Sequence, residues 1–593
     1  MLKSISLVIL SFSLLATANA VANPLALFVE QCLQYSPNLS ALAQQSPDKA
    51  AINAVEFEKQ TLALNNINDR IQYYRPFAND NLSKQGLLWC QLHLADELYA
   101  LNTSNNTQQL IESMHLLESP YNQLAQRLEN IQQTQWDLIE KSKLHSAQAT
   151  VDQALSTRQL QIKFNSTECE LTPQTHDHTQ EQSQQSNINI HIAKYLHQQT
   201  NEQCRQKAWF AYQLRAKSKV HSALNVIHQL HQQRAQDKGY NNAAQLMLAN
   251  SQLSPTNLKE FLDTQTASFS VAPWNLAQAL SRTEKSPTIT PVATKDYLAR
   301  LLSQLSVFGI HTDLIKDSAI QTAELTQNTG EQKQHTQILR IWHHQRLLGE
   351  IYTYPHTSQE QQLHVKGQLI RQSVIGHQFG QYALSFPIQL TQQKQQKQLI
   401  DELSQAIVSL SQGGQFYLLT HKTQNQQHHA IASMWLSHYL TQFQHFAPPS
   451  EREKLIQNYQ TQMRVFKSKV ALAFYQHSRS INDLEWLTLK DDLSLAFTQG
   501  FGQPWPNATD TIYSFQAIAN QGISYYLPLW QDAVAKLIIN QASSTFSAVE
   551  IFNILVVNEA YLSFNDQLEQ LIGAPIDPHS LIWRIKHVAT AQE

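Results

Sequence analysis

The chain has 593 residues, of which only 14 are glycine, and a formal net charge of −3 at pH 7. The small net charge gives no electrostatic reason to expect a nucleic-acid partner. Scarce glycine argues against a protein dominated by sheets with tight turns, whereas abundant Gln, Leu and Ala favour a mostly helical protein. The length exceeds that of one compact core, so two lobes or more are expected.

Residues 1–20 have the pattern of a secretory signal peptide. Lys3 supplies the positive charge, residues 5–15 form a short apolar core, and Ala18-Asn19-Ala20 is a small-x-small cleavage site. No later segment is long and apolar enough to span a bilayer. The sequence therefore predicts an exported protein, periplasmic or secreted, with no membrane span after removal of the signal.

The four cysteines are Cys32, Cys90, Cys169 and Cys204. An even count behind an export signal favours two disulfides. Three connectivities are possible. We favour the pairing of sequence neighbours, Cys32 with Cys90 and Cys169 with Cys204.

Residues 21–200 have helical patterns without a recognisable motif. From residue 201 the sequence predicts a helical hairpin. Gly239 ends one helix, and Ser254 before Pro255 is a good N-cap and first-position pair for the next.

A strand is predicted from Leu348 to Tyr354, where apolar residues and tyrosines alternate before Pro355. This strand is expected to belong to a small sheet.

The stretch from Gln368 to Gln405 is predicted to begin with a buried helix. Apolar residues recur at helical spacing, and His377 and Gln381 fall on the same stripe; its apolar members are Ile370, Val374 and Leu384. This is the arrangement of the zinc-binding motif His-Glu-x-x-His. Here the sequence reads His377-Gln378-Phe379-Gly380-Gln381.

The Phe-Gly inside this motif resembles the His-Glu-Phe-Gly-His of the thimet oligopeptidase/oligopeptidase A family of zinc metallopeptidases. The resemblance implies a mostly α, two-lobed fold with a deep channel between the lobes and a small sheet near the metal helix. Residues 201–593 would be the homologue of the catalytic domain. Gln378 would then stand at the general-base position and Gln381 at a lost ligand position, which leaves His377 as a weak ligand at most.

The family's third ligand, a Glu, lies on the next helix, within Val-Glu-x-Pro-Ser-Gln. Matching Ser404-Gln405 to the end of that motif puts Asp401 at the ligand position. The apolar face of the predicted helix instead brings Glu402 closer to the interior. Two solvated carboxylates are a third reading, and the sequence does not decide among them.

The region from Phe515 to Trp530 resembles the family's Gly-His-x-x-x-Gly-Tyr-x-x-x-Tyr-Tyr-x-Tyr-x-Trp, whose His and Tyr residues bind substrate and the oxyanion. Gln516, Gln521 and Pro528 stand at three of those positions. Tyr525, Tyr526 and Trp530 remain. The resemblance implies that Tyr525, Tyr526, Gln516 and Gln521 line a substrate site, whereas Trp530 is expected in the core.

The residues lost relative to the family are the chemical ones, so no catalytic residue and no cofactor are expected. Three hypotheses follow: a non-catalytic protein that binds peptides, an active metallo-oligopeptidase with an irregular zinc site, and a scaffold that binds a partner protein. Zinc content separates the second hypothesis from the others, and peptide binding separates the first from the third.

Overall fold

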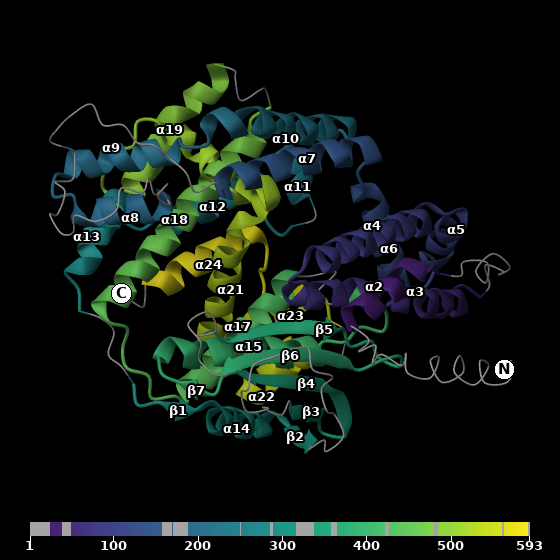
Figure 1. Ribbon diagram of the computed structural model, residues 1–593. Coiled ribbons are helices and arrows are strands. Elements are labelled where there is room, and N and C mark those ends of the chain that lie inside the picture. The colour runs from purple at the N-terminus through teal and green to yellow at the C-terminus, as the bar shows by residue number, and fades with distance from the viewer. Residues whose placement is uncertain are drawn as a thin grey trace, which may run out of the picture. The chain divides into compact units, whose positions relative to one another are not determined.

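The computed structural model describes residues 24–37, 49–156, 169, 188–249, 251–284, 289–315, 337–356, 364–420, 426–478, 484–559 and 562–590 (Figure 1). The predicted signal peptide, residues 1–20, lies outside the described residues. The chain forms two compact units. The first comprises Met1–Gln135, Thr290–Thr441 and Phe552–Glu559, and the second comprises Trp136–Ile289, Gln442–Ile551 and Ala560–Glu593. The boundary predicted at residue 200 falls inside the second unit.

The first unit combines helices with the larger of two sheets. Its helical elements are α2 (Pro24–Gln34), α3 (Ala50–Tyr74), η3 (Arg75–Phe77), α4 (Asn81–Thr103), α5 (Asn105–Met114), α6 (Tyr121–Thr134), α14 (Thr294–Gln304), η6 (Leu305–Phe308), α15 (Gln393–Ser411), η7 (Tyr417–Leu419), α17 (Gln426–Gln442) and the π-helical turn η10 (Asn553–Val557). One apolar core joins α3, α5 and α6 to Phe416, and another joins α2, α3 and α4.

The larger sheet has the strand order β2-β3-β4-β6-β5. Its strands are β2 (Ile310–Ile315), β3 (Gln337–His343), β4 (Arg346–His356), β5 (Lys366–Arg371) and β6 (Gly380–Pro387). The pair β4–β6 is parallel and the other pairs are antiparallel. Two short strands, β1 (Val292–Ala293) and β7 (Gln389–Leu390), form a separate antiparallel pair. The strand predicted near residues 348–354 is therefore present as β4.

The helix predicted to begin near residue 370 is wrong, because this stretch forms a β-hairpin of β5 and β6. Val374 and Gln378 exchange backbone hydrogen bonds, each 2.9 Å from nitrogen to oxygen. Between them Gly376 adopts a left-handed φ of +84°, which turns the chain and which glycine adopts without steric cost. The helical spacing of residues 370, 374, 377, 381 and 384 is a coincidence of two short strands joined by this turn.

The helix α15 packs closely on one face of the sheet, across two facing glycines. Gly349 in β4 and Gly380 in β6 are register partners. A Cβ built on Gly349 would lie 2.3 Å from the Gly380 oxygen and 2.6 Å from Cδ2 of Leu410, which belongs to α15. The absence of side chains at both positions therefore sets the distance between helix and sheet.

The second unit is helical throughout its described residues. Its elements are α7 (Leu138–Ser156), α8 (Ile188–Gln198), α9 (Glu202–Gln213), α10 (Lys217–Asp237), α11 (Ala243–Leu248), α12 (Pro255–Thr264), η5 (Pro273–Asn275), α13 (Leu276–Ser281), α18 (Glu451–Gln476), α19 (Leu484–Phe501), η8 (Ala508–Tyr513), α20 (Ala517–Asn520), η9 (Gly522–Tyr526), α21 (Leu527–Ala542), α22 (Ala548–Phe552), α23 (Phe564–Ile572) and α24 (Pro578–Thr590). Gly239 has φ +77° after α10, and the Ser254 side chain caps α12 with Pro255 in its first turn, both as predicted. The prediction of a mostly helical fold with a small sheet is confirmed.

Both predicted disulfides are present. Cys32 in α2 is bonded to Cys90 in α4, and Cys169 is bonded to Cys204 in α9. The pairing of sequence neighbours is therefore confirmed. Among the described residues, no helix combines the length and the apolar character needed to cross a membrane.

We expect the substitution Gly349→Ala to lower the free energy of unfolding by about 1–3 kcal/mol, the usual range for overpacking a core. The new methyl group has no space between the Gly380 oxygen and Leu410. Urea denaturation followed by circular dichroism measures the change as a lower midpoint. The matched control is Gly500→Ala in α19, where only Oε1 of Gln462 lies within 4 Å of the new methyl group, at 3.9 Å. Alanine favours a helix over glycine by up to about 1 kcal/mol, so this control should be neutral or stabilising. Equal losses in both variants would contradict the packing argument.

Candidate functional site

The helix α15 positions the carboxylates that the sequence singled out. It starts with a capping box in which Gln392 and Gln395 each bond the other's backbone. Its apolar side packs against the sheet through buried residues that include Leu399, Leu403, Ile407 and Leu410. This phase leaves Asp401 exposed and Glu402 half-buried toward the sheet, which is the orientation that the apolar pattern indicated.

Glu402 lies against the strands β5 and β6. The Tyr382 hydroxyl donates a hydrogen bond to its Oε2 atom at 3.3 Å. A Cβ built on Gly367 would lie 2.2 Å from the same oxygen and 2.4 Å from the Tyr382 hydroxyl. The bare backbone of Gly367 thus makes room for a carboxylate and a phenol.

The surroundings of Glu402 favour its protonated form. Burial raises the pKa of this carboxyl group above its usual value, and the negative charge of Asp401 raises it further. The hydrogen bond from Tyr382 and the backbone N–H of Gly367 act in the opposite direction. Burial and the adjacent carboxylate also raise the pKa of Tyr382. The pair is therefore a carboxyl group and a phenol that share one desolvated space.

Asp401 points to the other neighbour of α15, the helix α17. The Ser437 hydroxyl donates a hydrogen bond to Oδ1 of Asp401. Asp401 keeps contact with solvent, but partial desolvation by the packed helices raises its pKa, while this hydrogen bond and the positive charge of Lys397 lower it. Neither Ser437 nor Tyr382 was singled out from the sequence, because only the packing of α15 brings them to the two carboxylates.

Asp401, Glu402 and Gln405 have the spacing of His-Glu-x-x-His on a helix. Gln405 is exposed on the same helix. A zinc ion in a protein takes His, Cys or carboxylate ligands, usually three or four of them. The described residues contain no group of three such side chains that could hold a metal ion. A carboxylate, an amide and the Ser437 hydroxyl are not a donor set for zinc, so the residues present do not fit the metal that the resemblance implies.

Two residues of the predicted metal motif, Gln378 and Gln381, hold the hairpin in place through side-chain hydrogen bonds. Gln378 exchanges two side-chain hydrogen bonds with Asn66 of α3, at 2.7 and 2.9 Å, and donates a third to the Gln372 carbonyl. His377 is exposed at the tip of the turn. Gln381 lies in β6 and donates to the Tyr352 hydroxyl at 3.0 Å. These three side chains therefore do not converge on one point as the helical prediction required.

The four residues predicted to bind substrate lie in the second unit, in or just before α20 and η9. Gln516 donates a hydrogen bond to Asp152 at 3.0 Å, and Gln521 is exposed. The Tyr525 ring is half-buried against Phe515, with Arg464 above its face. Tyr526 is buried in the core, with 1% of its surface exposed. Their role toward a substrate stays a prediction.

Trp530 is fully buried, as predicted, with its ring 5.1 Å from that of Phe261 between centroids. Its indole N–H donates to Gln252 at 3.1 Å. Two histidines of the first unit, His343 and His428, are also buried.

Comparison with known proteins identifies solved structures with a similar fold. Neither a model of a protein family nor a curated protein sequence matches this chain. Among solved structures, the chain is similar to a protein of Chlamydophila abortus assigned to the peptidases, with a TM-score of 0.59 and 12% identity over 95% of this chain and 96% of the other. It is also similar to PZ peptidase A with an inhibitor, with a TM-score of 0.51 and 11% identity over 96% and 97% of the two chains.

These similarities extend over almost the full length of both chains. The chain therefore shares the fold of these two peptidase structures, at an identity too low to carry any residue role across. What the site can do chemically must be read from its own side chains: a carboxyl–phenol pair on the sheet and a second carboxylate bonded to a serine.

We expect Glu402→Gln to stabilise the protein at alkaline pH and to lose this effect in acid. A raised pKa in the folded state means that the native protein binds the proton more tightly than the unfolded chain. The free energy of unfolding of the wild type therefore falls as pH rises from about 4.5, the ordinary pKa of a glutamate, through the raised pKa of Glu402 in the folded protein. Urea midpoints between pH 4 and pH 8 should show the gap between variant and wild type opening with pH. Glu118→Gln, at an exposed position before α6, measures the effect of removing a surface charge. A gap that is constant across this pH range would contradict the desolvation of Glu402.

Proposed function

We propose that this protein is an exported, non-catalytic member of the oligopeptidase-type fold that holds peptides without hydrolysing them. The observation that carries the proposal is the donor set on α15. This helix follows the strands of the sheet in the chain, and Asp401-Glu402-x-x-Gln405 has the spacing of the zinc motif. We therefore assign the counterpart of the zinc helix to α15 rather than to residues 377–381.

The chemical losses on α15 remove the basis of hydrolysis. Without zinc, water keeps its bulk pKa of about 15.7 instead of about 7. Each missing oxyanion donor costs a further factor of roughly 10²–10³ in rate, and the family's donor positions in the second unit hold Gln516, Gln521 and Pro528. Glu402 alone retains the general-base position, but it has no metal-bound water to deprotonate. The alternative, an active metallo-oligopeptidase, requires zinc ligands that the described residues do not supply.

The strand β5 is the element we expect to take up a peptide. It is an edge strand of the sheet, and the described residues pair it only with β6. An unpaired edge binds an extended peptide as an added strand through main-chain hydrogen bonds, with side-chain pockets adding selectivity. Gly367 at this edge brings the peptide next to Glu402 and Tyr382.

Export agrees with the covalent structure. Disulfides persist in oxidising compartments and are rare in the cytosol, and both cysteine pairs are bonded. The proposed location is therefore the periplasm or the extracellular space. A partner protein that presents an extended segment to β5 would use the same binding chemistry as a free peptide.

We expect a mixed set of extended peptides, about 8–12 residues long, to protect the amides of β5 from hydrogen–deuterium exchange. The other edge strand, β2, provides an internal control that should not change. Mass spectrometry of the same samples should recover the peptides uncut after prolonged incubation, with and without a chelator. Cleavage that a chelator abolishes would establish the active-peptidase alternative. Protection absent from β5 in every mixture would exclude peptide binding at this edge.

We expect the triple variant Asp401→His, Gln405→His, Ser437→Glu to bind one zinc ion. It rebuilds two imidazoles one turn apart on α15 and adds a carboxylate from α17, where Ser437 already contacts position 401. Metal content after dialysis measures the gain. The matched control is Gln378→Glu with Gln381→His. It restores the family sequence His-Glu-Phe-Gly-His on the hairpin and should bind no zinc. If the control binds zinc and the triple variant does not, residues 377–381 are the counterpart of the zinc motif and the assignment to α15 is wrong.

A further inference from the structure

The outer face of α4 carries an apolar ridge that no described residue covers. Lys84, Leu88, Leu92 and Asp96 follow one another at intervals of four and so form one i, i+4 row on the helix. Leu88 is 52% and Leu92 is 55% exposed, and both charged ends are exposed as well. Beside the row, Trp89 is 53% exposed. A soluble surface rarely leaves such side chains together without a partner.

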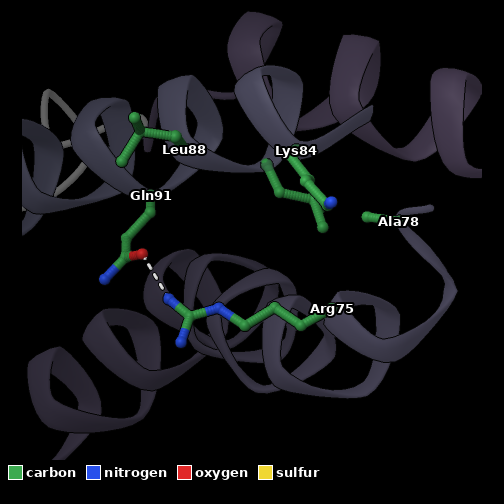
Figure 2. A pocket seen from close by; sticks show the side chains of 6 residues that line it. Arg75, Ala78, Lys84, Leu88 and Gln91 are labelled. Atoms are coloured by element: carbon green, nitrogen blue, oxygen red, sulfur yellow. Dashed lines mark hydrogen bonds between the residues drawn. The ribbon is translucent and has the colours of Figure 1, made fainter. Parts of the chain in front are cut away.

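A cavity of about 210 Å³ opens beside this row, between α4 and η3 (Figure 2). Four of its lining residues, Lys84, Leu87, Leu88 and Gln91, have the spacing i, i+3, i+4 and i+7. This is the four-residue hole that receives one side-chain knob of a packed helix. Arg75 and Ala78 close the other side, and the Arg75 guanidinium donates to Gln91 at 2.5 Å.

The charges and the leucines of this row are symmetric about position 90. Lys84 and Asp96 lie six residues to either side of it, and Leu88 and Leu92 lie two residues to either side. An antiparallel second copy of α4 would therefore place Lys84 opposite the partner's Asp96 twice, and Leu88 opposite the partner's Leu92 twice. Such self-complementarity is what a twofold interface requires.

The hole is in register with the same pairing. Its centre, between residues 87 and 88, faces the partner between residues 92 and 93, so the partner's Leu92 is the knob that enters the cavity. The charged positions lie about 9 Å along the helix from the twofold axis. At a crossing angle of about 20° they stay within reach of a lysine side chain. The described residues give neither Lys84 nor Asp96 an ion-pair partner within the chain.

We propose that α4 is a homodimer interface, in which two copies of this chain pack antiparallel through Lys84, Leu88, Leu92 and Asp96. The contact is one helix per chain, extended by Leu82, Trp89 and Tyr99, which are also exposed. An interface of this size is at the small end for proteins, so we expect a reversible dimer with a Kd on the order of micromolar. The cystine between Cys32 and Cys90 fixes α2 on the opposite side of the same helix.

Sedimentation equilibrium of the oxidised chain, from about 1 to 100 µM, tests the proposal. We expect concentration-dependent dimers, and a Kd raised by about 30-fold or more in Leu92→Asp, as for a hot-spot residue. Leu116→Asp is the matched control, because Leu116 is 88% exposed elsewhere in the first unit. Since both leucines are exposed, neither substitution should disturb folding.

Charge reversal separates this pairing from other apolar association. Lys84→Asp alone and Asp96→Lys alone should each weaken self-association, because like charges then face each other twice. An equimolar mixture of these two variants should form mixed dimers more tightly than either variant alone, and the double variant should dimerise like the wild type.

Three results would overturn the proposal: a monomer at every concentration, a dimer that Leu92→Asp leaves intact, or no gain on mixing the two charge variants. The proposal would also be overturned if the chain stays monomeric and binds phospholipid vesicles or another protein through α4.

Discussion

The contact between α15 and the sheet determines where the two candidate carboxylates of the first unit lie. Two glycines, one on each of two parallel strands, let Leu410 approach the sheet backbone more closely than any side chain would permit. This approach fixes the rotation of α15, and the rotation directs Glu402 to Tyr382 and Asp401 to Ser437. A quarter turn of the helix would break both of these hydrogen bonds.

The helix α15 carries a carboxyl group whose ionisation weakens the fold. Desolvation disfavours the ionised form of Glu402, and replacing it by an apolar residue of similar size would avoid that cost. Tyr382 and the bare edge at Gly367 compensate only in part. Destabilised polar groups are typical of binding surfaces, where a ligand completes the hydrogen bonds that the protein leaves weak.

Local rules predicted much of the fold from the sequence. The cap at Ser254, the left-handed Gly239, the buried Trp530 and both disulfides depend on neighbours in the chain or on an even cysteine count. The hairpin from β5 to β6 was missed, since its two strands are short and their apolar residues also match a helical spacing. Gly376 was the signal in the sequence that could have shown the hairpin. Glycine readily adopts the positive φ that ends a helix and turns a hairpin.

For the candidate site, the sequence predicted which residues of α15 to consider but not the partners that other elements bring to them. The apolar phase of residues 399–410 oriented Glu402 correctly. Tyr382, Gly367 and Ser437 come from other elements, and no periodicity indicates which strand a helix will cover. Pattern matching to His-Glu-x-x-His selected residues 377–381, which form a turn and the start of β6 instead of the helix that the motif needs.

The interleaving of the two units has a consequence for the order in which the chain can fold. The first unit is incomplete without residues 552–559: Phe552 stacks on Phe308 with ring centroids 4.3 Å apart, and the Leu555 carbonyl accepts hydrogen bonds from Gln412 and His428. Domains normally fold one after another as they leave the ribosome. Here the first unit must wait until the second has been almost wholly synthesised. A chain whose first core cannot close early stays exposed to proteases and to aggregation for that time.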